Sequence, residues 1–199
     1  MKVLVVEAEP GGALDAKAAL TAAGHTVIDC DTPELHAPCR GLASVGMCPL
    51  DEDDVDVAVV HHAGRDLSVG ERGALCAARA RVPVVVDGDY RRSVSFGPGT
   101  FVAGVDLVDA CAAAARSGMA HSAAVRRELL CAGVIEPDDV AHAQPKVSFV
   151  VEREPKRLKL TIHLPAGDPR QANITKAAAE ALRRFDTKAT VIDVVLETT

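Results

Sequence analysis

The chain has no tryptophan and one tyrosine, and aromatic residues make up 3% of it. Proteins that bind single-stranded nucleic acid stack bases on such side chains, so their scarcity argues against that function. The net charge is −6, although residues 146–199 carry ten Lys and Arg against seven Asp and Glu. This local excess is too small to form a nucleic-acid footprint, so we expect no nucleic-acid partner.

Long apolar runs are also missing. No stretch approaches the roughly 18 consecutive apolar residues of a membrane span, although 48% of the residues are hydrophobic. The opening segment, MKVLVVEAEP, turns acidic too early for a secretory signal peptide, which needs a longer apolar stretch and a cleavage site. We therefore expect a cytoplasmic protein with no membrane partner, whose six cysteines stay reduced.

Several motifs of nucleotide-binding and hydrolytic proteins are absent. The sequence contains no complete G-x-G-x-x-G fingerprint, no Walker loop and no G-x-S-x-G elbow. Gly11 and Gly12, which follow the first apolar run, fit a turn better than a phosphate-binding loop. The acidic run at 51–54 likewise reads as a solvated turn.

Short Val-rich runs alternate with helix-forming segments through the first part of the chain. We expect strands at 3–6, 25–30, 55–60, 82–86 and 100–103, and helices at 13–23, 68–81 and 105–116. This alternation predicts an α/β fold with a doubly wound, five-stranded parallel sheet. Ser68 and Glu71, at the start of the second helix, have the spacing of a capping box.

The pattern changes after residue 118. Residues 119–145 are expected to form a linker helix and a connection. Beyond them we expect antiparallel strands at 146–151 and 158–164, an amphipathic helix at 169–185 and a strand at 191–196. The segment 146–199 is therefore predicted to be a small α+β subdomain of ββαβ type, following the α/β domain.

The opening VLVVEAEP resembles the first strand of a response-regulator receiver domain, and strand number and spacing over residues 1–118 agree with that flavodoxin-like fold. The family holds magnesium with paired acids after the first strand and accepts phosphate on an aspartate ending the third. Here Glu7 is followed by Ala8, and His61 and His62 stand where the acceptor belongs. Asp87 replaces a small hydroxyl residue, and FVAGVD lacks the Lys-Pro that follows the fifth strand. The resemblance therefore implies a pseudo-receiver that has lost aspartyl phosphorylation.

A Cys/His constellation is the main candidate site. Cys30 ends the second expected strand, and His36, Cys39 and Cys48 lie in the irregular insertion 31–54, which replaces a receiver helix. These four residues could bind zinc tetrahedrally. An iron-sulfur cluster on the cysteines, a reversible Cys39–Cys48 disulfide, or inert thiols that simply pack are the alternatives.

Glu7 and His61 are expected to contribute to cofactor binding, because the carboxyl ends of parallel strands meet at one edge of the sheet. Side chains alternate along a strand, so either His61 or His62 must point to the opposite face, and we assign His61 to the site. The remaining thiols and imidazoles are expected to be structural: Cys76, Cys111 and Cys131 in the core, and His121, His142 and His163 at the surface.

Three functions stay open. The first is a non-phosphorylated regulatory or interaction protein with a metal, iron-sulfur or redox site at the strand edge. The second is a metal- or thiol-dependent enzyme using the same edge, and the third is a structural oligomerisation scaffold. The pattern of residues 146–199 resembles alkaline-shock-protein-type modules, and the exposed edge of its sheet predicts a protein partner or self-association as a homodimer.

Overall fold

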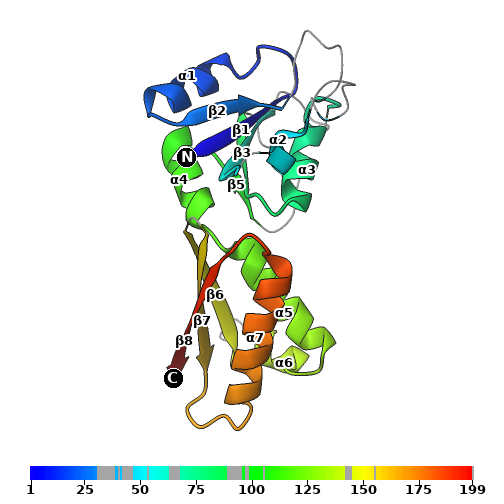
Figure 1. Ribbon diagram of the computed structural model, residues 1–199, viewed down its shortest axis with the longest axis vertical. Helices are drawn as coiled ribbons and strands as arrows, with labels where there is room; N and C mark the ends of the chain where they lie inside the picture. Colours follow the sequence, from blue (N-terminus) through cyan, green and yellow to red (C-terminus); the bar gives the residue numbers. More distant parts are fainter. Residues whose placement is uncertain are drawn as a thin grey trace. The chain divides into compact units, whose positions relative to one another are not determined.

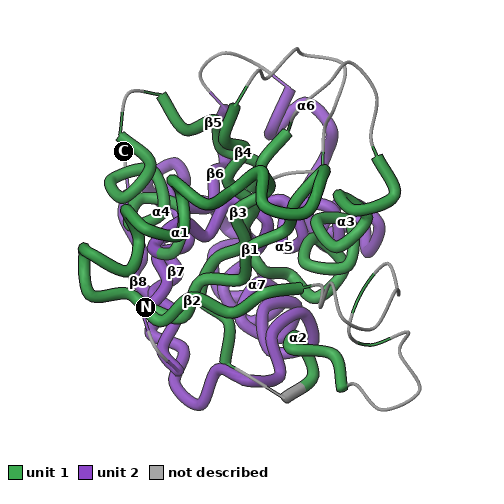
Figure 2. The backbone as a smooth tube through the Cα atoms, turned by 90° about the horizontal axis from the view of Figure 1, so that it is seen from above, with its two compact units in different colours: residues 1–115 green, residues 116–199 purple. Residues whose placement is uncertain are grey.

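The computed structural model describes residues 1–30, 39, 41, 47–52, 54–62, 68–88, 96, 99–104, 106–141, 145–154 and 156–198. The chain divides into two compact units, Met1–Ala115 and Arg116–Thr199, which Figure 2 shows in different colours. Each unit has its own apolar core. Among the described residues, no helix is long and apolar enough to cross a membrane.

The first unit is an α/β domain built on a five-stranded parallel sheet (Figure 1). Its strands are β1 (Lys2–Glu7), β2 (Thr26–Asp29), β3 (Val57–His62), β4 (Val84–Gly88) and β5 (Thr100–Val102). Its helices are α1 (Leu14–Ala22), α2 (Pro49–Glu52), α3 (Arg72–Arg79) and α4 (Leu107–Arg116). The strands lie in the order β2-β1-β3-β4-β5, and every neighbouring pair is parallel. This confirms the predicted fold class.

Helices cover both faces of this sheet, which explains why its central strands are apolar runs rather than alternating sequences. One face packs against α1 and α4 through a cluster that includes Val3, Val5, Val57, Val59, Val85, Leu20 and Ala114. The other face packs against α3 through a cluster that includes Leu4, Val6, Ala58, Val60, Val86, Ala74 and Ala77. Neighbouring residues of one strand therefore belong to different cores.

The described residues of the predicted insertion 31–54 include one short α-helix, α2. Leu50 of α2 is buried, as is Val55 beyond it, and both join the cluster on the α3 face. Cys39 and Cys48 are also described, whereas 31–38, 40, 42–46 and 53 lie outside the described residues. The part of the insertion nearest β3 is thus anchored by ordinary apolar burial.

The second unit is a three-stranded sheet in the order β6-β7-β8. Its elements are α5 (Met119–Cys131), α6 (Pro137–Val140), β6 (Ser148–Glu154), β7 (Arg157–Leu164), α7 (Gln171–Phe185) and β8 (Val191–Thr198). β6 and β7 form the predicted antiparallel hairpin, with Glu154 paired to Arg157. Lys156 in the turn has a φ of 61°. β8 then joins β7 in parallel after the crossover through α7.

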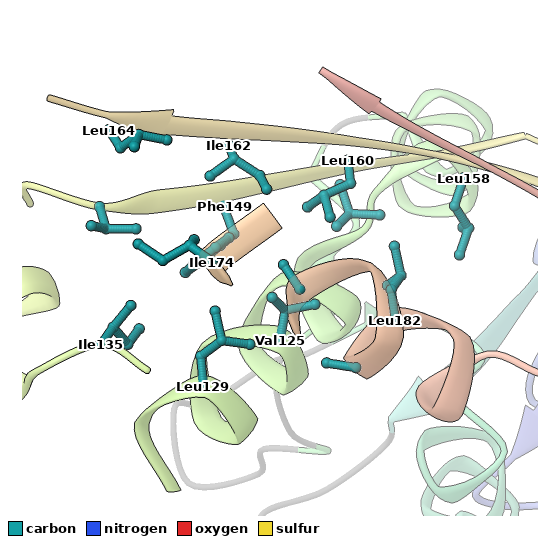
Figure 3. Close-up of a cluster of buried hydrophobic side chains, with 14 residues drawn as sticks. Val125, Leu129, Ile135, Phe149, Leu158, Leu160, Ile162, Leu164, Ile174 and Leu182 are labelled. Atoms are coloured by element: carbon teal, nitrogen blue, oxygen red, sulfur yellow. The ribbon is translucent and has the colours of Figure 1, made fainter. Parts of the chain in front are cut away.

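The helix expected to link the domains belongs instead to the second unit. Val125 and Leu129 of α5 are fully buried in the same cluster as Leu160 and Ile174 (Figure 3). The physical reason is coverage, because the apolar row of three strands offers more surface than α7 alone conceals. The predicted ββαβ elements β6, β7, α7 and β8 are present, and α5 and α6 precede them within a unit that begins at Arg116.

Candidate functional site

Glu7, His61 and Asp87 form one row across three neighbouring strands, at the carboxyl edge of the first sheet. Glu7 of β1 pairs in register with His61 of β3, which pairs with Asp87 of β4. Partners in register share a face of the sheet, and this row continues the face that packs against α1 and α4. The structure thus places the two predicted cofactor-binding residues, Glu7 and His61, side by side.

An imidazole–carboxylate pair forms the centre of this row. His61 Nδ1 lies 3.0 Å from Asp87 Oδ2, and both side chains are about one-quarter exposed. A carboxylate can only accept, so the neutral ring donates from Nδ1 and its Nε2 becomes an acceptor. Among the described residues, Nε2 makes no hydrogen bond, and the ring edge faces Gly12, where an added Cβ would lie 3.4 Å from His61 Cδ2.

Lys17 of α1 connects the row to its neighbours. It forms ion pairs with buried Glu7 and, at 2.7 Å, with Asp29 at the end of β2. Glu7 Oε2 also accepts a hydrogen bond from Gly11 N at 2.5 Å. Burial alone would lower the pKa of Lys17, but its hydrogen bonds to Asp29 and Glu7 outweigh that effect and raise it. Lys17 is therefore a fixed positive charge that neutralises acids of this edge.

The side chain of His62 points to the face of the sheet opposite to that of His61, as the alternation of strand side chains predicts. It is buried on the α3 face, where its Nδ1 contacts Glu71 Oε1. Glu71 Oε2 accepts from Ser68 N at 2.6 Å, and Ser68 Oγ accepts from Glu71 N at 3.2 Å. The two predicted residues do bond to each other reciprocally, but Ser68 is not the N-cap: the helix begins at Arg72 with Glu71 as its N-cap, and no side-chain hydrogen bond caps it. Glu71 thus has a second role, bracing β3, that no sequence motif indicated.

Three of the four predicted metal ligands, the cysteines, lie on the α3 side of the sheet. Cys30 is buried there, and Cys39 and Cys48 pack against the same apolar cluster. His36, the fourth predicted ligand, lies outside the described residues. Among those that are described, no three His, Cys, Asp or Glu side chains are grouped so that they could hold a metal ion. The sheet itself separates Cys30 from His61, because the two residues belong to opposite faces.

The other three cysteines divide by exposure. Cys111 of α4 is buried, as predicted, and burial together with the charge of Asp87 raises the pKa of its thiol to about 12. Cys76 and Cys131 are exposed, so the prediction of core positions was wrong for both. Cys76 lies among alanines and Cys131 between Leu130 and Ala132, and neither pattern distinguishes an inner from an outer face of the helix. All six cysteines are free thiols, including Cys39 and Cys48.

The burial of His121 and its pairing with a carboxylate were not predicted from the sequence. His121 was predicted at the surface, but it is 1% exposed and its Nε2 lies 2.9 Å from Asp186 Oδ2. The ring also packs edge-on against Phe185. A signal was present, because His121 precedes the buried residues Val125 and Leu129 at helical spacing.

The two remaining histidines of the surface prediction differ in what is known of them. His163 is about one-third exposed and pairs with Glu197 at 3.1 Å. His142 lies outside the described residues.

Comparison of the chain with protein-family models, with curated protein sequences and with solved structures finds no match.

Proposed function

We propose that residues 1–115 form a receiver-like regulatory module that carries no phosphoryl group and responds instead to a cation at the His61–Asp87 pair. One observation carries this proposal: His61 occupies the end of β3, in register between Glu7 and Asp87. That is where the family resemblance expects the phosphate acceptor. An imidazole there offers a nitrogen donor in place of the acceptor carboxylate.

The charges at this edge argue against phosphoryl transfer. Glu7, Asp29 and Asp87 are carboxylates, and Lys17 is already engaged by the first two. β5 is followed by Ala103 and Gly104, so the expected lysine is missing. A phosphoryl anion would therefore meet uncompensated negative charge. The repulsion costs on the order of 1 kcal/mol for each contact with a solvent-screened carboxylate.

The same charges favour a cation. His61 Nε2 suits borderline transition metals such as zinc, and imidazole ligands commonly bind them. The described residues of the edge offer fewer than three grouped ligands. Binding there would be weak and reversible, which fits a sensor better than a permanent structural metal.

A thiol-dependent enzyme at this edge has less support. Cys111 is the cysteine in the core cluster of this face, and its raised pKa keeps the thiol protonated at neutral pH. A protonated, buried thiol is a poor nucleophile. The zinc or iron-sulfur set of Cys30, His36, Cys39 and Cys48 remains a separate prediction, and its three cysteines lie on the other face of the sheet.

Two measurements on the full chain test the proposal. Incubation with acetyl phosphate and Mg²⁺, followed by intact-mass spectrometry, should add no phosphoryl group, and a stable adduct would contradict the loss of phosphorylation. Titration with Zn²⁺, followed by the imidazole signals in NMR, should perturb His61 in the wild-type protein. His61→Ala should remove the response of the first unit.

His163→Ala is the matched control, because His163 also pairs with a carboxylate at 3.1 Å but lies in the second unit. This variant should keep the Zn²⁺ response of the first unit unchanged. A response that survives in His61→Ala and disappears in His163→Ala would show that the binding site is elsewhere.

A further inference from the structure

The outer edge of β8 is the long unpaired strand edge of the second unit. β8 pairs with β7 along its whole length, and no other described strand joins it. Val191, Val194 and Val195 of β8 are 45%, 36% and 36% exposed. The strand contains no proline, lysine or arginine, which are the residues that commonly protect such edges.

The other sheet edges are shorter or already occupied. β2 and β5, the edges of the first sheet, have four and three residues. In the second unit, the edge of β6 is engaged: Val151 N donates to Ser122 Oγ at 3.1 Å, and Ser117 forms a bridge with Glu152. β8 differs from all of these, because its eight residues carry no comparable protection among the described residues.

The backbone of β8 shows which of its residues face outward. Val191 N donates to Lys156 O, so Val191 directs its polar groups toward β7. Successive residues of a strand alternate in this respect. The N–H and C=O groups of Ile192, Val194 and Leu196 therefore face the open edge.

We propose that β8 pairs antiparallel with β8 of a second copy of this chain, with Val194 opposite Val194 of the partner subunit. A twofold axis through this pair makes a continuous sheet, and Val194 exchanges both backbone hydrogen bonds with its counterpart. Ile192 then lies opposite Leu196 of the partner subunit. Asp193 lies opposite Val195 of the partner subunit, and Val191 opposite Glu197 of the partner subunit.

Side-chain chemistry selects this register over its neighbours. On the helix-facing side, Ile192, Val194 and Leu196 form an apolar row that is complementary to itself. Centring the pair on Val195 would place Asp193 directly opposite Glu197 of the partner subunit, and centring it on Asp193 would oppose two aspartates. Like charges directly opposite each other destabilise a sheet. The inference concerns residues 116–199 and does not depend on the proposed function of the first unit.

Two valine-to-lysine substitutions on the same strand test the pairing, with sedimentation velocity on the full chain as the readout. The wild-type protein should sediment as a dimer, and Val194→Lys as a monomer, because two lysines would meet at the axis. Val191→Lys should remain a dimer at least as stable as the wild type, because the new lysine faces Glu197 of the partner subunit. Circular dichroism should show that both variants fold, since both valines are substantially exposed.

A mixed cross-link fixes the register. Copies with Asp193→Cys and copies with Val195→Cys, both lacking the exposed Cys76 and Cys131, should form a disulfide between unlike copies on mild oxidation. Either variant alone should cross-link poorly. Each of three outcomes would overturn the proposal. They are a monomeric wild-type chain, a Val194→Lys dimer as stable as the wild type, and preferential cross-linking of Val195→Cys copies with one another.

Discussion

His61 Nδ1 and Asp87 Oδ2 lie 3.0 Å apart across the register pair that joins the ends of β3 and β4. The carboxylate fixes which nitrogen of the neutral ring carries the proton, and the other nitrogen becomes the available donor atom. Asp87 is therefore an acid that orients the imidazole of His61 at this edge of the sheet.

The tautomer of His61 gives the first prediction. In the wild-type protein, the neutral ring should be protonated at Nδ1, and ¹⁵N NMR of the imidazole should show this directly. Asp87→Ala should abolish the preference, because the accepting carboxylate is gone. Asp109→Ala, which removes an exposed acid from α4 of the same unit, should leave the tautomer unchanged. An unaltered His61 spectrum in Asp87→Ala would show that the pair does not form in solution.

Thiol reactivity should separate the two exposed cysteines from the two buried ones. Cys76 and Cys131 are exposed and should react quickly with a disulfide reagent in the native protein. Cys30 and Cys111 are buried, and the raised pKa of Cys111 further suppresses its thiolate. Mass mapping of the labelled sites at increasing times checks the order. Rapid native labelling of Cys111 would contradict its packing against the first sheet.

Metal content distinguishes the predicted ligand set from plain packing. If Cys30, His36, Cys39 and Cys48 bind zinc, protein purified without chelator should contain about one zinc per chain by elemental analysis. Replacing Cys39 and Cys48 by serine should then remove it, whereas Cys76→Ser should not. A colourless, metal-free protein whose stability is unaffected by chelator would assign the three cysteines to the apolar cluster that they contact.

Gly118 is predicted to be intolerant of a side chain. An added Cβ would lie 2.1 Å from Val151 O, inside the contact between the start of α5 and the edge of β6. Gly118→Ala should lower the free energy of unfolding by about 1–3 kcal/mol, the range of overpacked sites. Gly104→Ala is the matched control, because a Cβ there meets nothing within 4 Å among the described residues. Chemical denaturation of both variants measures the difference.

The His121–Asp186 contact predicts an acid-sensitive second unit. The hydrogen bond from His121 lowers the pKa of Asp186 to about 2, below the usual range of an aspartate. A carboxyl group with a depressed folded-state pKa stabilises the protein above its unfolded pKa, and this stabilisation is lost as the pH falls from about 4 to about 2. The loss should be of the order of 2 kcal/mol.

Asp186→Asn tests that contribution. The variant should be less stable than the wild type at neutral pH, and the difference should shrink as the pH falls toward about 2. Denaturant unfolding across this pH range measures it. A difference that stays constant with pH would mean that the ionised carboxylate contributes nothing specific.

The sequence revealed the parts of the fold that depend on local periodicity. Val-rich runs around Val5 and Val59 indicated buried parallel strands, and the His61-His62 dipeptide indicated that the two rings must diverge. The helix at 119–131 was predicted, but its place in the core of the second unit was not, because its sequence is rich in alanine and few of its apolar residues are buried. The surface that it covers is formed by β6 and β7, which come later in the chain, so this contact is known only from the folded structure. His121 and Asp186 likewise form a contact although they are 65 residues apart in the sequence.

The candidate site was harder to anticipate. The order of the strands correctly suggested that Glu7 and His61 are neighbours, but not that the sheet would divide them from Cys30. The ion pairs of Lys17 follow from its place on α1 above the ends of β1 and β2, and a lone helical lysine gives no such indication.

The parallel pairing of β8 with β7 also has a consequence for biosynthesis. β8 follows every other strand of its unit along the chain, so a ribosome delivers α5, β6, β7 and α7 before it. Until β8 emerges, one edge of β7 is unpaired along Leu158 and Leu160, which are buried in the completed unit. The first unit can already be folded at that stage, because domains fold in order during synthesis. The second unit therefore cannot complete its sheet before its last strand has been synthesised.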